Sequence, residues 1–253
     1  DNAATVAARF AGEAEGMTYS RLQNPTVQML EERIALMEGA EACRTQATGM
    51  AAMTTAQIQA LGTDQLAALQ TNQVNALTAA QVGKLTTDQV VALSEDQVAT
   101  LTTKQLNVLT SAQVAALSVD QVAAMTTLQI AGLTTTHMVG LSTSNISGLS
   151  TTQVAALETA DLSAMVTSAF AAVTPSAVAT LSGPQVGALT SDQVTALTTA
   201  QAAALTATQA GGITTVQTAA LESGDLNKLS TAAFAALATG VVAGLSSTQV
   251  GAL

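Results

Sequence analysis

The chain has 253 residues and a net charge of −10, and only 9% of its residues are charged and 2% aromatic. The acidic balance excludes a nucleic-acid binder, which needs a basic face to displace counterions from phosphates. A hydrophobic fraction of 48% is too high for a solvated disordered chain, yet polar residues interrupt every stretch before the roughly 18 apolar residues of a membrane span. The composition therefore predicts a folded chain without a membrane span, with a core of Leu, Val and Ala.

The first 53 residues differ in kind from the rest. They hold four of the seven basic residues and the only tyrosine and cysteine in the sequence. A single cysteine, Cys43, excludes an internal disulfide. The stretch from Asn24 to Gly39 starts with Asn-Pro-Thr, continues with an amphipathic pattern and stops at a glycine, which predicts a helix.

The run TYSRLQNPTVQMLEERIALMEGAEACRTQATGMAAMT at 18–54 closely resembles the N-terminal part of the pyridoxal-phosphate (PLP) enzymes of cysteine and methionine metabolism, with the O-succinylhomoserine sulfhydrylases as the best match. The resemblance implies that Tyr19 and Arg21 would reach the cofactor phosphate of a neighbouring subunit. It also implies that Gly49 and Met50 would bind the same phosphate.

The same resemblance also predicts that these positions are vestigial. The family's Schiff-base lysine lies in a large α/β domain beyond the matching segment, and the lysines after Thr54 all lie within repeats: Lys84, Lys104 and Lys228. Without that lysine the electron-sink chemistry has no anchor. We therefore expect no catalytic residues and no cofactor, with PLP bound only if other chains completed the site.

From Thr54 to Leu253 the sequence is an array of 25 octapeptides in unbroken register, since 25 × 8 accounts for its 200 residues. Position 8 is Leu in 21 units, position 5 is apolar in 24, position 4 is Gln in 17 and position 1 is Ser or Thr in 19. The exception at position 5 is Thr218. We therefore divide the chain into an enzyme-like helical segment, 1–53, and a repeat array, 54–253.

The octapeptide has the signature of a short capped helix. Ser or Thr followed three residues later by Gln is the spacing of a capping box, and positions 5 and 8 share one helical face. Aspartate at position 3 stands where a helix N-terminus favours negative charge. Five units carry it, as Asp64, Asp88, Asp96, Asp120 and Asp192.

One continuous helix does not suit this period. Because each residue advances a helix by about 100°, eight residues rotate the apolar pair by about 80° beyond two turns, and the apolar stripe would circle the rod. A chain that bends once per octapeptide keeps every pair inside, so we predict an all-α superhelical solenoid of very short helices. The alternative is a β-solenoid with eight residues per side, favoured by the Thr and Val content.

A longer period overlies the octapeptides. Residues 158–189 recur in altered form at 222–253, an offset of 64 residues or eight units. In both copies position 4 becomes aspartate, at Asp161 and Asp225, and the following unit carries phenylalanine, at Phe170 and Phe234. The pattern indicates duplication of a block of repeats.

His137 replaces Gln at position 4 of TTTHMVGL. No Cys or second His accompanies it, so we expect a hydrogen-bonding substitute and no metal site.

The repeats favour a structural role, as a spacer, stalk or adhesin segment of a larger bacterial surface or secreted protein. The array resembles the octapeptide arrays of large bacterial adhesin-like proteins. Two alternatives stay open: a binding module that uses the solenoid face for a peptide, a glycan or an ordered surface, and a residual PLP-dependent sulfhydrylase. Expected partners are an unidentified protein or surface and other copies through the array ends. A secreted or cell-surface location is favoured, or a cytoplasmic one if residues 1–53 reflect the true context.

Overall fold

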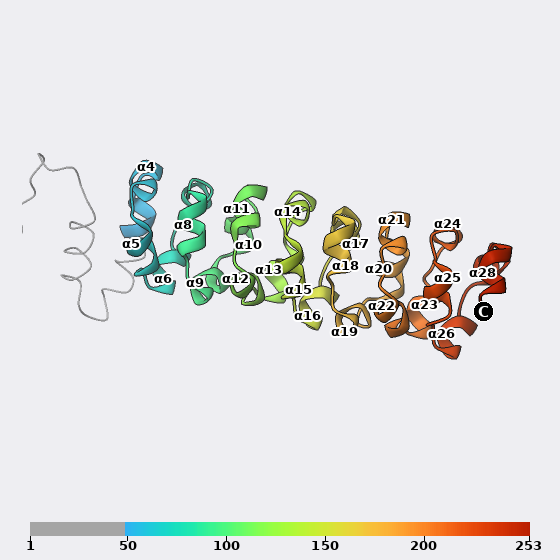
Figure 1. Ribbon diagram of the computed structural model, residues 1–253. Helices are drawn as coiled ribbons and strands as arrows, with labels where there is room; N and C mark the ends of the chain where they lie inside the picture. Colours follow the sequence, from blue (N-terminus) through green and yellow to red (C-terminus); the bar gives the residue numbers. More distant parts are fainter. Residues whose placement is uncertain (1–48) are drawn as a thin grey trace, which may run out of the picture. The chain divides into compact units, whose positions relative to one another are not determined.

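The computed structural model describes residues 49–253, and this part of the chain consists of short helices with short connections (Figure 1). Contacts between Cα atoms divide the chain into two units, Asp1–Gln46 and Ala47–Leu253, and the second holds all the octapeptides. The described residues contain no β-strand, so the all-α prediction is confirmed and the β-solenoid alternative is wrong. Each octapeptide forms one helix: α4 (Thr55–Gln59), α5 (Thr63–Ala67), α6 (Thr71–Asn75), α7 (Ala79–Val82), α8 (Thr87–Ala92), α9 (Glu95–Thr100), α10 (Thr103–Leu106), α11 (Ser111–Ala116), α12 (Val119–Ala123), α13 (Thr127–Ala131), α14 (Thr135–Gly140), α15 (Thr143–Ser147), α16 (Thr151–Ala155), α17 (Thr159–Ala164), α18 (Thr167–Ala171), α19 (Pro175–Val178), α20 (Gly183–Gly187), α21 (Ser191–Thr195), α22 (Thr199–Ala204), α23 (Ala207–Ala210), α24 (Thr215–Thr218), α25 (Ser223–Leu226), α26 (Thr231–Ala235), α27 (Thr239–Ala243) and α28 (Ser247–Gly251).

Each helix is short because the octapeptide carries its own start and stop. At α8, the Thr86 hydroxyl accepts a hydrogen bond from the Gln89 N–H (3.1 Å), and the Gln89 Oε1 accepts one from the Thr86 N–H (2.9 Å). This is the predicted capping box. Leu93, at position 8, has an extended backbone (ψ 138°), which ends the helix and turns the chain toward the next cap.

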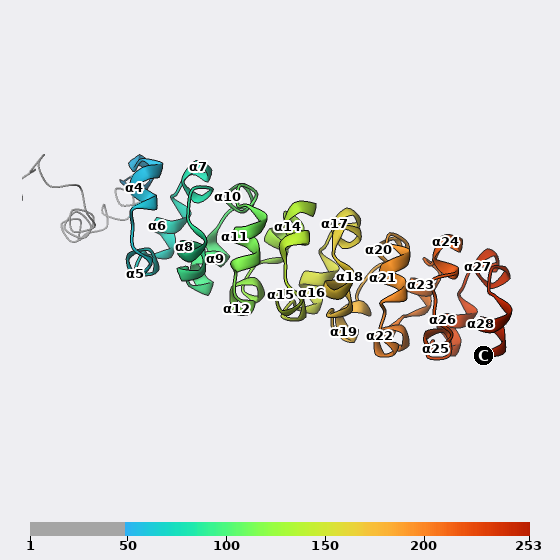
Figure 2. The same cartoon turned by 45° about the horizontal axis from the view of Figure 1, so that its top comes forward.

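Successive octapeptides coil into a superhelix whose turn holds between three and four units. Helices pack against those three units before and after them, as in the series α8, α11, α14 and α17. Hydrogen bonds also join a unit to the one four before it, for example from Gln121 to Leu93. Figures 1 and 2 show the resulting turns stacked along one axis. The array is therefore a solenoid stabilised by contacts between neighbouring turns.

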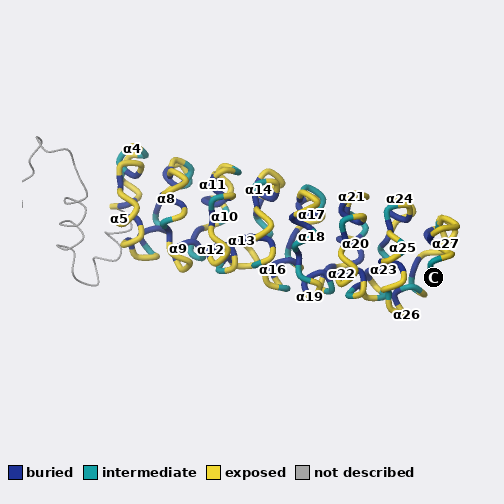
Figure 3. Tube along the Cα trace, in the orientation of Figure 1, coloured by how far each residue is buried: buried dark blue, intermediate teal, exposed yellow. Residues whose placement is uncertain are grey.

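The superhelix encloses positions 5 and 8, as the pattern predicts. Val98 and Leu101 of one unit are 0% and 4% exposed, and most other units repeat this pair. Buried and exposed stretches accordingly alternate along every turn (Figure 3). Thr218, the polar residue at position 5, is also buried, and its hydroxyl donates to the Thr214 carbonyl oxygen (3.3 Å). The inward face is thus kept even where the residue type departs from the pattern.

Close approach of two turns requires glycine at Gly212. A Cβ there would overlap the backbone of Gly183 on the neighbouring turn, and a Cβ at Gly187 would lie 2.7 Å from the Gly212 carbonyl oxygen. We expect Gly212→Ala to lower the free energy of unfolding by about 1–3 kcal/mol, because one backbone must shift. In the control Gly224→Ala, the added Cβ meets nothing within 4 Å, and stability should be unchanged or rise by up to about 1 kcal/mol. Urea unfolding of the full chain measures both, and equal losses would contradict the close-approach argument.

Candidate functional site

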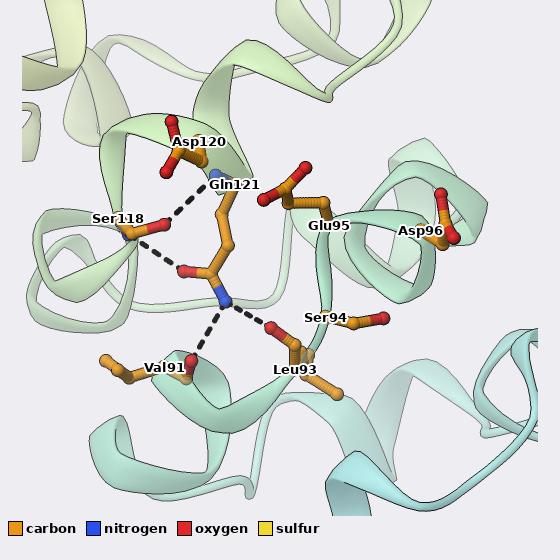
Figure 4. Close-up of a pocket in the computed structure, with 8 residues that line it drawn as sticks. All are labelled: Val91, Leu93, Ser94, Glu95, Asp96, Ser118, Asp120 and Gln121. Atoms are coloured by element: carbon orange, nitrogen blue, oxygen red, sulfur yellow. Dashed lines mark hydrogen bonds between the residues drawn. The ribbon is translucent and has the colours of Figure 1, made fainter.

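The most elaborate polar arrangement in the array surrounds the side-chain amide at position 4. Gln121 on α12 illustrates it (Figure 4). Its Oε1 accepts a hydrogen bond from the Ser118 N–H (2.8 Å), within its own unit. Its Nε2 donates to the carbonyl oxygens of Leu93 (2.6 Å), Val91 (3.1 Å) and Val90 (3.1 Å), four units earlier. One buried amide therefore bonds the start of its own helix and the end of a helix on the preceding turn.

These two sets of hydrogen bonds satisfy backbone groups that a short helix leaves without partners. The first N–H groups and the last C=O groups of a helix have no partner within it, and buried backbone groups without a partner are costly. Sixteen position-4 side chains donate to the carbonyl oxygen 28 residues earlier, at N···O distances of 2.6–2.9 Å. This acceptor is a position-8 residue in fifteen cases and Met53, just before the array, for Gln81. We call this set the inter-turn ladder, and it consists of Gln81, Gln89, Gln97, Gln105, Gln113, Gln121, Gln129, His137, Asn145, Gln153, Gln185, Gln193, Gln201, Gln209, Gln217 and Gln249.

His137 takes part in the ladder. Its Nδ1 accepts from the Thr134 N–H (3.2 Å), and its Nε2 lies 2.9 Å from the Leu109 carbonyl oxygen. These two contacts assign the proton to Nε2, because a carbonyl oxygen only accepts hydrogen bonds. The imidazole thus reproduces both roles of the glutamine amide, and this arrangement leaves neither ring nitrogen for a metal ion.

Six units have no donor at position 4, and they form two blocks of three, residues 158–181 and 222–245. Each block starts with a buried aspartate, Asp161 or Asp225, both 3% exposed. Burial raises the pKa of the Asp161 carboxyl above its usual range, the charge of Glu158 raises it further, and the charge of His137 lowers it. Burial likewise raises the pKa of Asp225, with Glu222 adding to the rise.

The groove between α9 and α12, with a volume of about 340 Å³, has three acidic residues among those that line it (Figure 4). Glu95 and Asp96 come from the first turn of α9 and Asp120 from that of α12. The other lining residues are Val91, Leu93, Ser94, Ser118 and Gln121. The Ser118 and Gln121 side chains already bond one another's backbone, and no group of three metal-ligating side chains occurs in residues 49–253.

Two further grooves lie between turns. One, of about 480 Å³, is lined by Ser, Thr, Ala, Val and Gly alone. The other, of about 640 Å³, has Glu222 as its one charged residue. None of the three grooves is lined by His, Cys, Lys or Arg. Within the described chain these grooves therefore offer no imidazole, thiol or amine as a base or nucleophile.

Only two of the four candidate phosphate-binding residues fall in the described chain, because Tyr19 and Arg21 lie outside it. Gly49 is exposed. Met50 is 1% exposed, and its carbonyl oxygen accepts a hydrogen bond from the Gln81 Nε2 (2.9 Å). Met50 is thus built into the first turns of the solenoid. Sequence reasoning missed this role and the burial of the position-4 amides.

Comparison with known proteins accounts for both parts of the sequence. A family profile described as Cys/Met metabolism PLP-dependent enzyme matches residues 2–138. The chain belongs to this PLP-enzyme family. A second profile, the ALTTAQ repeat, matches residues 122–159, 154–199 and 218–253. No solved structure matches the chain.

Pairwise similarity to members of the PLP-enzyme family is dense but short. O-succinylhomoserine sulfhydrylase of Pseudomonas aeruginosa is 59% identical over 51 residues, which are 20% of this chain and 13% of that enzyme. L-methionine gamma-lyase of Pseudomonas putida is 53% identical over 49 residues, 19% and 12% of the two chains. Homocysteine/cysteine synthase of Saccharomyces cerevisiae is 52% identical over 52 residues, 21% and 12%. The chain thus spans about an eighth of the length of these curated relatives.

The described residues do not fit the cofactor of the PLP-enzyme family. A Schiff-base lysine needs an enclosed site that excludes water, whereas Lys84, Lys104 and Lys228 are all exposed and lie on different units. Met50 is already packed inside the array. None of the helices described is long and apolar enough to cross a membrane.

Proposed function

We propose that the array is a non-catalytic structural scaffold that acts as a spacer or stalk in a larger bacterial surface or secreted protein. The observation that carries the proposal is the inter-turn ladder. Its polar side chains are directed inward, where they join one turn to the next at 2.6–2.9 Å. The position-4 glutamine, the most regular polar residue of the repeat, thus stabilises contacts between turns. Such contacts favour a long and rigid array.

The same proposal assigns no catalytic role to the enzyme-like segment. The pairwise similarity to the Pseudomonas aeruginosa enzyme covers a fifth of the chain, and the lysines of the array are exposed and lie on separate units. A binding role for the solenoid face has less support. Among the described residues the two most exposed large apolar side chains, Leu128 and Val216, lie far apart along the array, on α13 and α24.

Deletion of whole units tests the spacer. Removing residues 94–149 takes out seven octapeptides, about two turns, and preserves the register. Because packed helices lie about 8–10 Å apart, small-angle X-ray scattering should show a rod shortened by roughly 16–20 Å with an unchanged cross-section.

The matched control removes residues 94–145, which is six and a half units. It places position 5 where position 1 belongs, so residues 146–149 break the stacking of turns at the junction. We expect two separate melting steps and a scattering profile that no longer fits one straight rod. If the in-register deletion behaves like this control, or abolishes a specific small-molecule activity of the full chain, the spacer proposal is wrong.

A further inference from the structure

The inter-turn ladder is interrupted at two places, which we call the seams: residues 158–181 and 222–245. At position 4 the first seam has Asp161, Ala169 and Ala177, and the second has Asp225, Ala233 and Val241. Since one turn holds between three and four units, each seam removes the ladder from most of one turn.

The carbonyl groups that the ladder would reach are left without a donor. They belong to the position-8 residues 28 positions before each seam residue, namely Leu133, Leu141, Leu149, Leu197, Leu205 and Ile213. All six residues are at most 8% exposed. Within the described chain no side chain donates to their carbonyl oxygens. In place of the ladder, the first seam has apolar packing, including the fully buried Phe170, and one bond from the Thr180 hydroxyl to the Thr151 carbonyl oxygen (3.1 Å) on the preceding turn.

Asp161 and Asp225 stand where a donor belongs, and Asn145 shows that a side chain of their length reaches the acceptor. The Asn145 Nδ2 donates to the Leu117 carbonyl oxygen (2.9 Å), and its Oδ1 accepts from the Ser142 N–H (3.1 Å). A protonated aspartate offers the same pair, one O–H donor and one carbonyl acceptor. An ionised aspartate has no donor to offer the carbonyl oxygens of Leu133 or Leu197.

Few charges surround either carboxyl. Asp161 on α17 meets His137 on α14 and Glu158 at the start of its own unit, and α20, packed on its other side, carries no titratable residue. Asp225 on α25 meets Glu222, while α22 and α28, packed on its two sides, carry none. The exposed Lys228 follows α25. No cation is bonded to either carboxyl among the described residues.

We propose that the two seams are pH-responsive joints, closed by an aspartate-to-carbonyl hydrogen bond in acid and loosened when Asp161 and Asp225 ionise. The inference rests on the proposed scaffold function and adds to it two sites at which the contact between turns weakens. The direction in which stability changes with pH follows from proton binding. The folded pKa is raised above that of the unfolded chain, so the folded state binds more protons between the two values. Stability is therefore highest below the ordinary aspartate pKa of about 3.9 and falls as pH rises through the raised pKa.

The test compares the full chain with the double variant Asp161→Asn and Asp225→Asn. Both carry His137→Gln, because a protonated His137 could no longer accept from the Thr134 N–H. Asparagine supplies the donor at every pH. We expect the variant to unfold at a higher urea concentration at pH 7, with a gap that closes toward pH 4. Hydrogen exchange of peptides from 158–181 and 222–245 should be slowed about tenfold at pH 7 per unit by which the substitution removes the pKa rise. Peptides from 70–93, which hold neither a seam residue nor a seam acceptor, should change little.

The matched control is Asp120→Asn with Asp192→Asn, which removes two exposed negative charges from first helical turns. Its difference in urea midpoint from the reference chain should not shrink toward pH 4. The proposal is overturned if the seam variant is no more stable at pH 7, if its gap is independent of pH, or if the control behaves identically. Rod length by X-ray scattering tests the scaffold function separately, and an unshortened deletion variant would count against that function alone.

Discussion

Replacing Phe170 by alanine should lower the free energy of unfolding by about 3–5 kcal/mol, the usual cost of deleting a buried aromatic side chain from a core. Phe170 on α18 is 0% exposed and is the largest fully buried side chain in residues 49–253. It lies in the first seam, where the units have no position-4 donor. Its unit receives ladder bonds from Gln201 on the following turn but donates none to the preceding turn. Urea unfolding of the full chain should therefore show a large fall in the midpoint.

Phe234 provides the matched control, because it occupies the same position in the duplicated block 64 residues later. Its ring is partly exposed, so less apolar surface leaves water on folding and Phe234→Ala should cost about 1–2 kcal/mol. Equal losses at the two sites would show that the cost comes from the residue type and not from its burial. The Phe170→Leu variant should lie between wild type and Phe170→Ala.

The parts of the fold that depend on neighbours in sequence could be predicted. Thr54 and Gln57 form the capping box that their spacing indicates, with the Thr54 N–H donating to the Gln57 Oε1 at 2.8 Å. Ile58 and Leu61 are buried as positions 5 and 8 should be. Caps and helical faces are set within one octapeptide, so a period of eight residues contains enough information to specify them.

The inter-turn ladder could not be predicted in the same way, because its bonds span 28 residues. That separation depends on how many units make a turn, and packing between turns decides the number. One signal was present in the sequence. Glutamate would complete a capping box as well as glutamine, yet it is absent from position 4 of all 25 units, while Asn145 and His137 are allowed. Gln, Asn and His side chains each carry both a hydrogen-bond donor and an acceptor. The donor indicates a second hydrogen bond beyond the capping box.

The candidate phosphate-binding residues show the limit of reasoning from resemblance. Gly49 and Met50 match the PLP-enzyme family in sequence, but in this chain the octapeptides follow at once. The carbonyl oxygen of the buried Met50 accepts a hydrogen bond from the Gln81 Nε2. A side chain takes its role from the elements that surround it, and here those elements are repeats.

The ladder itself is tested by Gln121→Glu, which changes one atom's chemistry and leaves the shape intact. The carboxylate can still accept from the Ser118 N–H, so the capping box survives. It cannot donate to the carbonyl oxygens of Leu93, Val91 and Val90, and it places a charge beside them. We expect the free energy of unfolding to fall by about 3 kcal/mol at neutral pH, because a buried charged group without its partners costs more than a neutral one.

Three comparisons separate the ladder from other effects of a new charge. Gln59→Glu adds the same charge at an exposed position 6 and should change stability by less than about 0.5 kcal/mol. Gln121→Asn keeps both a donor and an acceptor, as Asn145 does, and should cost about 1 kcal/mol, because the shorter side chain leaves some contacts unmade. The loss in Gln121→Glu should shrink in acid, where a protonated carboxyl donates again. If Gln121→Glu unfolds at the same urea concentration as Gln59→Glu, the amide at position 4 serves only as a cap and the turns are held by apolar packing alone.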